Sequence, residues 1–92
     1  MKDKYRHIEH GRIVCNPGGS SKTVVKKFDK EYDEPPVVHY SVAKINGVTH
    51  GDDAYYELSP PVATKQSFTI TCKSEYGGKP DEIWIFWISF PQ

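Results

Sequence analysis

The chain of 92 residues lacks a long hydrophobic run, an excess of charge of either sign, and an N-glycosylation acceptor of the form Asn-x-Ser/Thr. A membrane-spanning helix needs about 20 apolar residues in succession, and the longest apolar stretch, residues 83–90, is too short. Twelve lysines and arginines balance twelve aspartates and glutamates. This balance argues against nucleic acid, whose binders usually carry a basic stripe, and against a polybasic membrane anchor.

Only two cysteines are present, Cys15 and Cys72, and no Cys-x-x-Cys pair exists, which excludes a zinc ribbon or a thioredoxin-like motif. The start, Met1-Lys2-Asp3-Lys4, is charged and no apolar run follows it. We therefore expect either a cytosolic protein or a mature form with a replaced start, and cysteine parity does not decide between them. If the two cysteines pair, the long closed loop is worth about 4 kcal/mol in the chain-entropy model. That is a large share of the stability of so small a domain.

No apolar period of 3.6 residues persists, so no helix is expected. Short stretches with period-2 alternation are instead spaced evenly and are separated by Gly, Pro and Asn turn signals. We predict a single all-β domain, an antiparallel β-sandwich of about six strands, over residues 11–92 after an N-terminal extension of residues 1–10. The predicted strands are Arg12–Cys15, Thr23–Phe28, Val37–Ile45, Tyr55–Leu58, Ser67–Lys73 and Ile83–Phe90.

The last strand is the most informative segment, because both of its faces are apolar. Side chains alternate between the two faces of a strand. One face carries Ile83, Ile85, Trp87 and Ser89, and the other carries Trp84, Phe86, Ile88 and Phe90. We expect one face to pack into the core and the other to be covered by another copy of the protein.

Residues with catalytic or ligating chemistry do not form a recognisable active site. His7 and His10 lack a third nearby zinc ligand, and Asp52-Asp53 beside His50 has no calcium-loop pattern. Residues 18–22, Gly-Gly-Ser-Ser-Lys, lack the glycine spacing and the following helix of a phosphate loop. No serine lies in a Gly-x-Ser-x-Gly elbow. We expect no metal, no cofactor and no enzymatic activity.

Six tyrosines, four phenylalanines and two tryptophans are many aromatic residues for this length. Aromatic side chains suit strands, and a flat ring can also cover the apolar face of a sugar. Loops rich in Asp, Tyr, Gly and Ser supply hydrogen-bonding partners for sugar hydroxyls, although loops of this kind occur at the ends of any sandwich. Composition alone therefore predicts only a small β domain.

The order and spacing of several separated segments resemble the H-type lectin domain of snail albumen-gland agglutinins, octocoral lectins and the discoidin C-terminal domain. The resemblance covers roughly residues 11–90. No single motif is specific. The segments are Gly11-Arg12-Ile13-Val14-Cys15, Phe28 and Tyr32 before Pro35-Pro36-Val37-Val38, then Ser41, Phe68, Cys72 and Trp87-Ile88-Ser89.

This resemblance implies a trimer, often doubled to a hexamer, that binds galactose or N-acetylgalactosamine without calcium at sites between protomers. It implies a disulfide between Cys15 and Cys72, hence an oxidising compartment and a secreted protein. Asp33-Glu34 stand where snail members carry the cysteine that links trimers, so a hexamer would be non-covalent. We expect Trp84, Phe86 and Trp87 at the oligomer interface.

The expected sugar site departs from the family pattern. Glu75-Tyr76 stand in place of a Trp-His pair, no arginine occurs between Asp52 and Phe68, and the loop from Asn16 to Ser21 has no aspartate. The resemblance therefore predicts where the pocket lies, but the residues expected to contact the sugar differ from those of the family. We predict Gly19 and Ser20 as loop contacts, Tyr55 as a wall, and Glu75, Tyr76 and Asp81 as polar and stacking partners.

Two other functions compete with a lectin. A receptor-binding tip of a phage-type fibre is a structural adhesion module, and related small domains occur there. An N-terminal coiled-coil stalk would favour it, and none is present in these residues. An enzyme is disfavoured because no acid–base pair or nucleophile constellation is visible.

Overall fold

The computed structural model describes residues 7–17, 21–46, 56–74 and 82–92, and all regular secondary structure within them is β-strand. No helix in this part of the chain is long and apolar enough to cross a membrane. The seven described strands are β1 (Glu9–Cys15), β2 (Ser21–Lys27), β3 (Val37–Asn46), β4 (Tyr56–Leu58), β5 (Val62–Ala63), β6 (Ser67–Ser74) and β7 (Glu82–Phe90).

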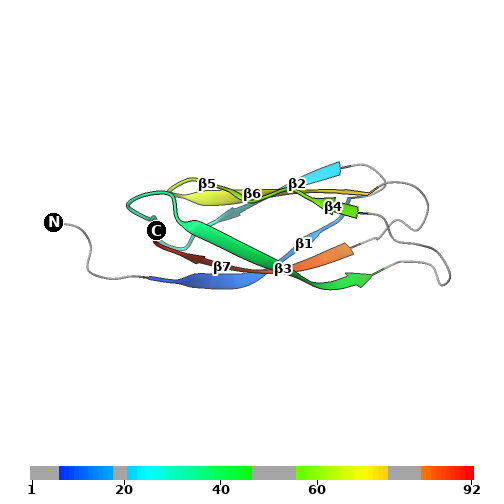
Figure 1. Cartoon of the computed structure of the whole chain (residues 1–92), viewed down its shortest axis with the longest axis horizontal. Coiled ribbons are helices and arrows are strands. Elements are labelled where there is room, and N and C mark those ends of the chain that lie inside the picture. Colours follow the sequence, from blue (N-terminus) through cyan, green and yellow to red (C-terminus); the bar gives the residue numbers. More distant parts are fainter. Residues whose placement is uncertain (1–6, 18–20, 47–55, 75–81) are drawn as a thin grey trace.

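The strands form two antiparallel sheets that lie one over the other (Figure 1). Sheet A has the order β1-β7-β3, and sheet B has the order β2-β6-β4, with β5 also paired to β6. The predicted all-β antiparallel class is therefore confirmed. The described strands number seven rather than the six expected, and the additional strand is β5.

The extra strand exists because the chain after β4 continues beside β6 instead of leaving the sheet. Pro60 and Pro61 have no backbone N–H and cannot donate to a neighbouring strand. The Ser59 N–H donates to the carbonyl of Thr71 (2.9 Å), and the Ser59 hydroxyl accepts from the Thr71 N–H (2.9 Å). Beyond the prolines, Val62 pairs with Thr69. β4 and β5 together act as one interrupted edge strand, a position in which proline is tolerated.

Strand β3 contains a bulge that keeps its polar side chains on one face. Its register against β7 shifts between Val42 and Lys44. Without the insertion, Lys44 would lie on the same face as Tyr40 and Val42. With it, Lys44 shares a face with His39 and Ser41. The opposite face of β3 carries Val38, Tyr40 and Val42, which pack against the core.

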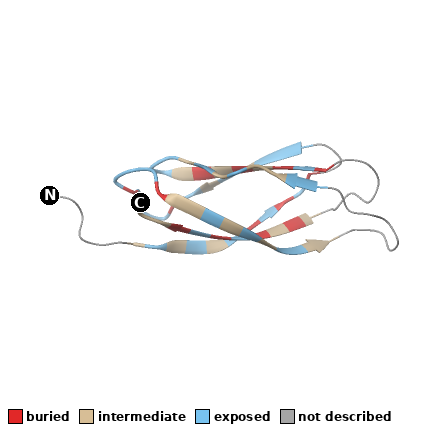
Figure 2. Cartoon of the chain, viewed as in Figure 1, coloured by how far each residue is buried: buried red, intermediate tan, exposed pale blue. Residues whose placement is uncertain are grey.

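The core lies between the sheets and is built by alternate residues of the central strands (Figure 2). On β6, Phe68, Ile70 and Cys72 are buried, as their spacing predicts. The Phe68 ring lies 4.9 Å from the Trp87 ring, centroid to centroid, so the two sheets are in direct aromatic contact. On β7 one face is buried, as expected, and the structure shows that it is the face of Ile83, Ile85, Trp87 and Ser89.

A disulfide joins the two sheets. Cys15 at the end of β1 is bonded to Cys72 of β6, with a Cα–Cα distance of 6.5 Å and a sequence separation of 57. Both cysteines are fully buried. The pairing that the family resemblance implied is therefore present.

The opposite end of the core is closed by the segment between β2 and β3. Phe28 and Tyr32 are buried with their rings edge to face, 5.0 Å apart. The Tyr32 hydroxyl lies 2.8 Å from the Ser89 hydroxyl, which gives the one polar residue on the inner face of β7 a hydrogen-bonding partner. Burial raises the pKa of Tyr32 above its ordinary value. This contact explains why a serine is accommodated in an otherwise apolar face.

Residues just before the predicted domain start also belong to the sandwich. The Glu9 carboxylate accepts hydrogen bonds from the N–H groups of Asp29 (2.8 Å) and Lys30 (3.0 Å). The His7 ring stacks on Tyr32, with centroids 3.9 Å apart. β1 accordingly begins at Glu9, and His10 pairs with Ile88.

Removing the disulfide should destabilise the fold strongly. For the Cys15→Ala/Cys72→Ala double variant we expect a loss of about 4 kcal/mol in the free energy of unfolding, because the unfolded chain regains the entropy of a long loop. Urea titration followed by tryptophan fluorescence measures this loss. An unchanged midpoint would show that the disulfide does not constrain the unfolded chain.

Replacing Tyr32 by Phe removes the hydroxyl that pairs with Ser89. Because Ser89 is fully buried, its hydroxyl is left without this partner, and we expect a loss of about 1–3 kcal/mol in unfolding free energy. Tyr56→Phe is the matched control at an exposed position, with an expected change within about 0.5 kcal/mol. Equal effects of the two variants in urea titration would contradict the role of Tyr32.

Candidate functional site

Six strand ends meet at one end of the sandwich, which we call the site end. In sheet A, Cys15 pairs with Ile83 and Asn46 pairs with Glu82. In sheet B, Ser21 pairs with Lys73 and Tyr56 with Ser74. The described ends of β1, β3, β6 and the starts of β2, β4, β7 are therefore together, on the right in Figure 1.

The predicted sugar contacts all adjoin the site end in sequence. Ser20 directly precedes β2, Tyr55 directly precedes β4, and Asp81 directly precedes β7. Glu75 directly follows β6. The full predicted set, which is Gly19, Ser20, Tyr55, Glu75, Tyr76 and Asp81, lies outside the described residues, so their roles stay predictions.

The disulfide joins the two sheets next to the site end. Cys15 is the last residue of β1, and Cys72 lies two residues before the end of β6. The bond therefore holds the two sheets at a defined separation next to the six strand ends. Binding residues carried between fixed strand ends lose less conformational entropy when a ligand binds.

The outer face of sheet A presents a central apolar column with polar and basic neighbours. Its column is the outward face of β7, in which Phe86 is 52% exposed and Ile88 is 40% exposed. The register places one residue of β1 and one of β3 beside each member of the column. From the site end the rows are Val14–Trp84–Lys44, Arg12–Phe86–Ser41 and His10–Ile88–His39, and beyond them Phe90 pairs with Val37.

Trp84 lies at the site end of this face and has two cations on its ring. The Arg12 guanidinium lies 4.3 Å and the Lys44 ammonium 5.2 Å from the ring centroid. The indole N–H donates to Glu82 Oε1 at 3.0 Å, and the Asn46 side-chain amide donates to the same oxygen at 3.2 Å. Ring, cations and carboxylate thus form one cluster, which we call the Trp84 cluster: Arg12, Lys44, Asn46, Glu82 and Trp84.

The hydrogen bonds of this cluster lower the pKa of Glu82 below its ordinary value. The bond from Trp84 contributes most, the bond from Asn46 comes next, and the charges of Lys44 and Arg12 act in the same direction. The carboxylate therefore remains ionised to a lower pH than a free glutamate side chain. Its contribution to stability is present above the unfolded pKa and is lost as the pH falls through the lower, folded pKa.

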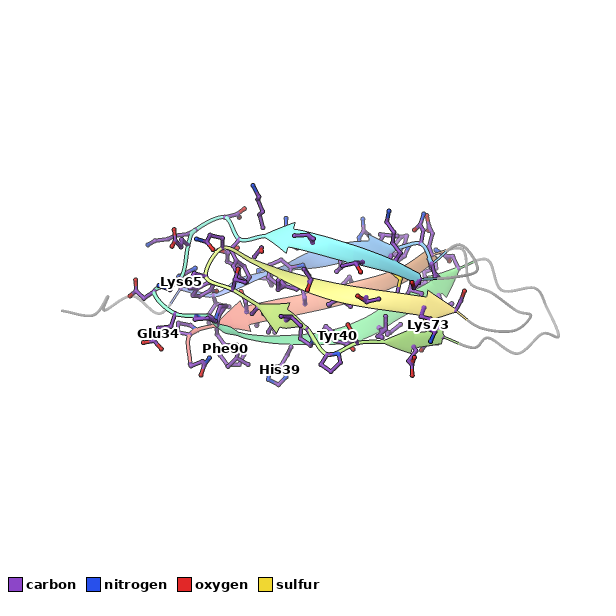
Figure 3. The ribbon with its side chains drawn as sticks, turned by 90° about the horizontal axis from the view of Figure 1, so that it is seen from above. Glu34, His39, Tyr40, Lys65, Lys73 and Phe90 are labelled. Carbon is purple, nitrogen blue, oxygen red and sulfur yellow. A yellow bond between two sulfur atoms is a disulfide. The ribbon has the colours of Figure 1, made fainter. Side chains whose placement is uncertain are left out.

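An open hollow of about 290 Å³ lies on the same face, between β3 and β7. It is lined by residues 39–41 and 86–88. His39, which lines the hollow, lies close to Phe90 (Figure 3). The two rings are stacked, with centroids 5.7 Å apart. The hollow combines an apolar floor, from Phe86 and Ile88, with a polar side from His39 and Ser41.

The predicted interface residues divide between the two faces of β7. Trp84 and Phe86 point outward, so both are accessible to a partner. Trp87 does not join them, because it is 4% exposed and packs in the core. A Cβ added at Gly11 would lie 3.3 Å from the Trp87 ring, so glycine there makes room for the buried indole. The expectation of Trp87 at the interface is therefore corrected to a core role.

Sequence reasoning missed the basic members of the Trp84 cluster. Arg12 lies in the predicted strand Arg12–Cys15 and Lys44 in the predicted strand Val37–Ile45, and neither has a binding role in the sequence-based prediction. Alternation places Arg12 on the outward face and the bulge in β3 turns Lys44 outward, but only the pairing of β1 and β3 with β7 brings both to one indole. Among the described residues no group of three or more His, Cys, Asp or Glu is arranged to hold a metal ion.

Replacing Trp84 by Phe should raise the pKa of Glu82 toward its ordinary value, because the phenyl ring has no N–H to donate. An NMR titration of the Glu82 side-chain carbonyl between about pH 2 and 7 measures both proteins across the ordinary carboxyl range. Identical titration curves for the two proteins would contradict the role of the indole hydrogen bond.

Comparison with known families finds a match to the H-type lectin domain over residues 23–90. A comparison with curated proteins finds no match. The matched region begins within β2 and ends with β7, so it includes both central strands and the second cysteine of the disulfide. It covers well over half of the chain, and together with the all-β sandwich it shows that this protein belongs to the H-type lectin domain family.

Proposed function

We propose that the protein is a multivalent lectin that binds galactose- or N-acetylgalactosamine-type glycans without calcium. The membership in the H-type lectin domain family carries this proposal. The convergence of six strand ends supports it, because short connections at one end of a rigid sandwich are where binding residues commonly lie. The family is non-enzymatic in general, and we propose binding without turnover.

The sugar site in this proposal consists of Gly19, Ser20, Tyr55, Glu75, Tyr76 and Asp81. Carboxylates accept charge-assisted hydrogen bonds from sugar hydroxyls, which are stronger than neutral ones. A tyrosine can stack on the apolar face of a pyranose and also hydrogen-bond through its hydroxyl. A site of this size orders few ligand atoms, so its affinity for a single sugar is weak.

Symmetric assembly would compensate for weak single sites. We propose a trimer, or two trimers joined without covalent bonds, in which several sites engage one glycan-bearing surface. Linked sites raise avidity by about 10²–10⁴ without new contacts. The exposed column of Phe86 and Ile88, with the hollow beside it, is the surface that we assign to the contact between copies.

The disulfide favours an extracellular location, since such bonds persist in oxidising compartments.

A glycan array on the purified oligomer tests the lectin proposal. We expect binding to galactose- or N-acetylgalactosamine-terminated glycans that persists in chelator and is lost with free galactose as competitor. Glu75→Gln and Tyr76→Ala should reduce this binding, and Glu57→Gln, a substitution on exposed β4, is the control. Loss of binding in chelator would overturn calcium independence, and an array without any bound glycan would overturn the lectin proposal.

A charge on the outer face of sheet A should prevent assembly. We expect Phe86→Glu to be a folded monomer, because assembly would then have to remove a charged carboxylate from water at the centre of an apolar contact. Val25→Glu is the matched control, since Val25 is similarly exposed, at 60%, but lies on sheet B. Light scattering after size exclusion gives the mass, and circular dichroism checks the fold. If both variants remain oligomeric, the contact lies elsewhere.

A further inference from the structure

We propose that the preferred glycan carries an anionic group, a sulfate ester or a carboxylate, and that Arg12 and Lys44 receive this group beside Trp84. This inference rests on the proposed lectin function and extends it by naming the charge of the ligand. It is carried by the Trp84 cluster, which neither the family match nor the sequence patterns assign to binding.

Two cations from different strands converge on one side chain. Lys44 of β3 is the direct register partner of Trp84. Arg12 of β1 is the register partner of Phe86, yet its guanidinium lies over the Trp84 ring. The Arg12 side chain therefore extends from the Phe86 row toward the site end. Both positive groups therefore lie in the Trp84 row, next to the Asn46–Glu82 pair at the site end.

The charge on this face is positive. Its ionisable groups from β1 and β3 are all basic, namely His10, Arg12, His39 and Lys44. Among the described residues the carboxylate of the cluster is Glu82, and its Oε1 already accepts from Trp84 and Asn46. One carboxylate opposes two permanent cations, although the whole chain has a formal net charge of zero. The complementary ligand group is an anion.

The geometry of the cluster also suits a sulfate or carboxylate attached to a sugar. A guanidinium presents several N–H donors in a plane that matches such oxygens, and an ammonium adds a compact second charge. Both are prepositioned by the indole ring through cation–π attraction, which reduces the entropy lost on binding. In this proposal the acidic substituent of the glycan contacts these two cations.

The Trp84 row lies at the margin of the proposed contact between copies. The most exposed apolar residues of the face, Phe86 and Ile88, lie farther from the site end than Trp84. Assembly through them leaves the cationic row next to the sites, where it remains open to solvent and to ligand. A glycan anion bound there would also reduce repulsion between the cations of neighbouring copies.

The test compares neutral, sulfated and sialylated galactose-terminated glycans on one array, with galactose, galactose 6-sulfate and galacturonic acid as competitors. We expect the acidic glycans to bind about 3- to 10-fold more tightly than the neutral ones. The preference should shrink as ionic strength rises, because exposed charges are screened over about 8 Å at physiological salt. Comparison of the sulfated with the sialylated glycans, and of galactose 6-sulfate with galacturonic acid, shows whether the preferred anionic group is a sulfate ester or a carboxylate.

Three variants locate the effect. Arg12→Gln and Lys44→Gln should bring the ratio of acidic to neutral affinity toward one, whereas Arg12→Lys should retain most of it. Lys27→Gln, on the exposed end of β2 in sheet B, should leave the ratio unchanged. Equal binding of neutral and acidic glycans by the unmodified protein would overturn this inference and leave the lectin proposal intact. Failure to bind any glycan would overturn both.

Discussion

Burial of the inner face of β7 is the constraint on which the rest of the structure depends. β7 is the central strand of sheet A and pairs with β1 on one side and β3 on the other. Its inner residues Ile83, Ile85 and Trp87 form much of the core, in contact with Phe68 of sheet B. Because side chains alternate strictly, this burial turns Trp84, Phe86 and Ile88 outward. A one-residue slip would exchange the two faces and expose the core.

The two ends of the sandwich are held by different chemistry. At the site end a covalent bond between Cys15 and Cys72 joins the sheets. At the other end the Tyr32 hydroxyl pairs with Ser89 while the Tyr32 ring packs against Phe28. A chain of this length buries only about 60% of its unfolded surface, so these connections carry a large share of its stability. The disulfide has the further effect of fixing the strand ends from which the proposed binding residues extend.

The outer face of sheet A carries both parts of the proposed mechanism. Its apolar centre at Phe86 and Ile88 is suited to a second copy, because burying exposed apolar area stabilises association. Its site end, with Arg12 and Lys44 over Trp84, is suited to an anionic ligand. In this proposal a single strand, β7, connects assembly with recognition. The family membership supplies the ligand class, and the charge distribution refines it.

Much of the fold was predictable because strand alternation is a local property. The sequence by itself determined that residues 67–73 and 83–90 are strands, that Phe68, Ile70 and Cys72 share one face, and the all-β antiparallel class. The cysteine pairing followed from the family resemblance. The six predicted sugar contacts could be placed next to strand ends, and they lie outside the described residues.

Tertiary structure alone decided which distant segments become neighbours. The order β1-β7-β3, the short strand after Pro61, and the core position of Trp87 depend on hydrogen bonds and packing between residues far apart in the chain. The Trp84 cluster is the clearest case, since Arg12 precedes Trp84 by most of the sequence. No local sequence pattern predicts the contact between Arg12 and Trp84, because the register between strands is set by the packing of the whole core.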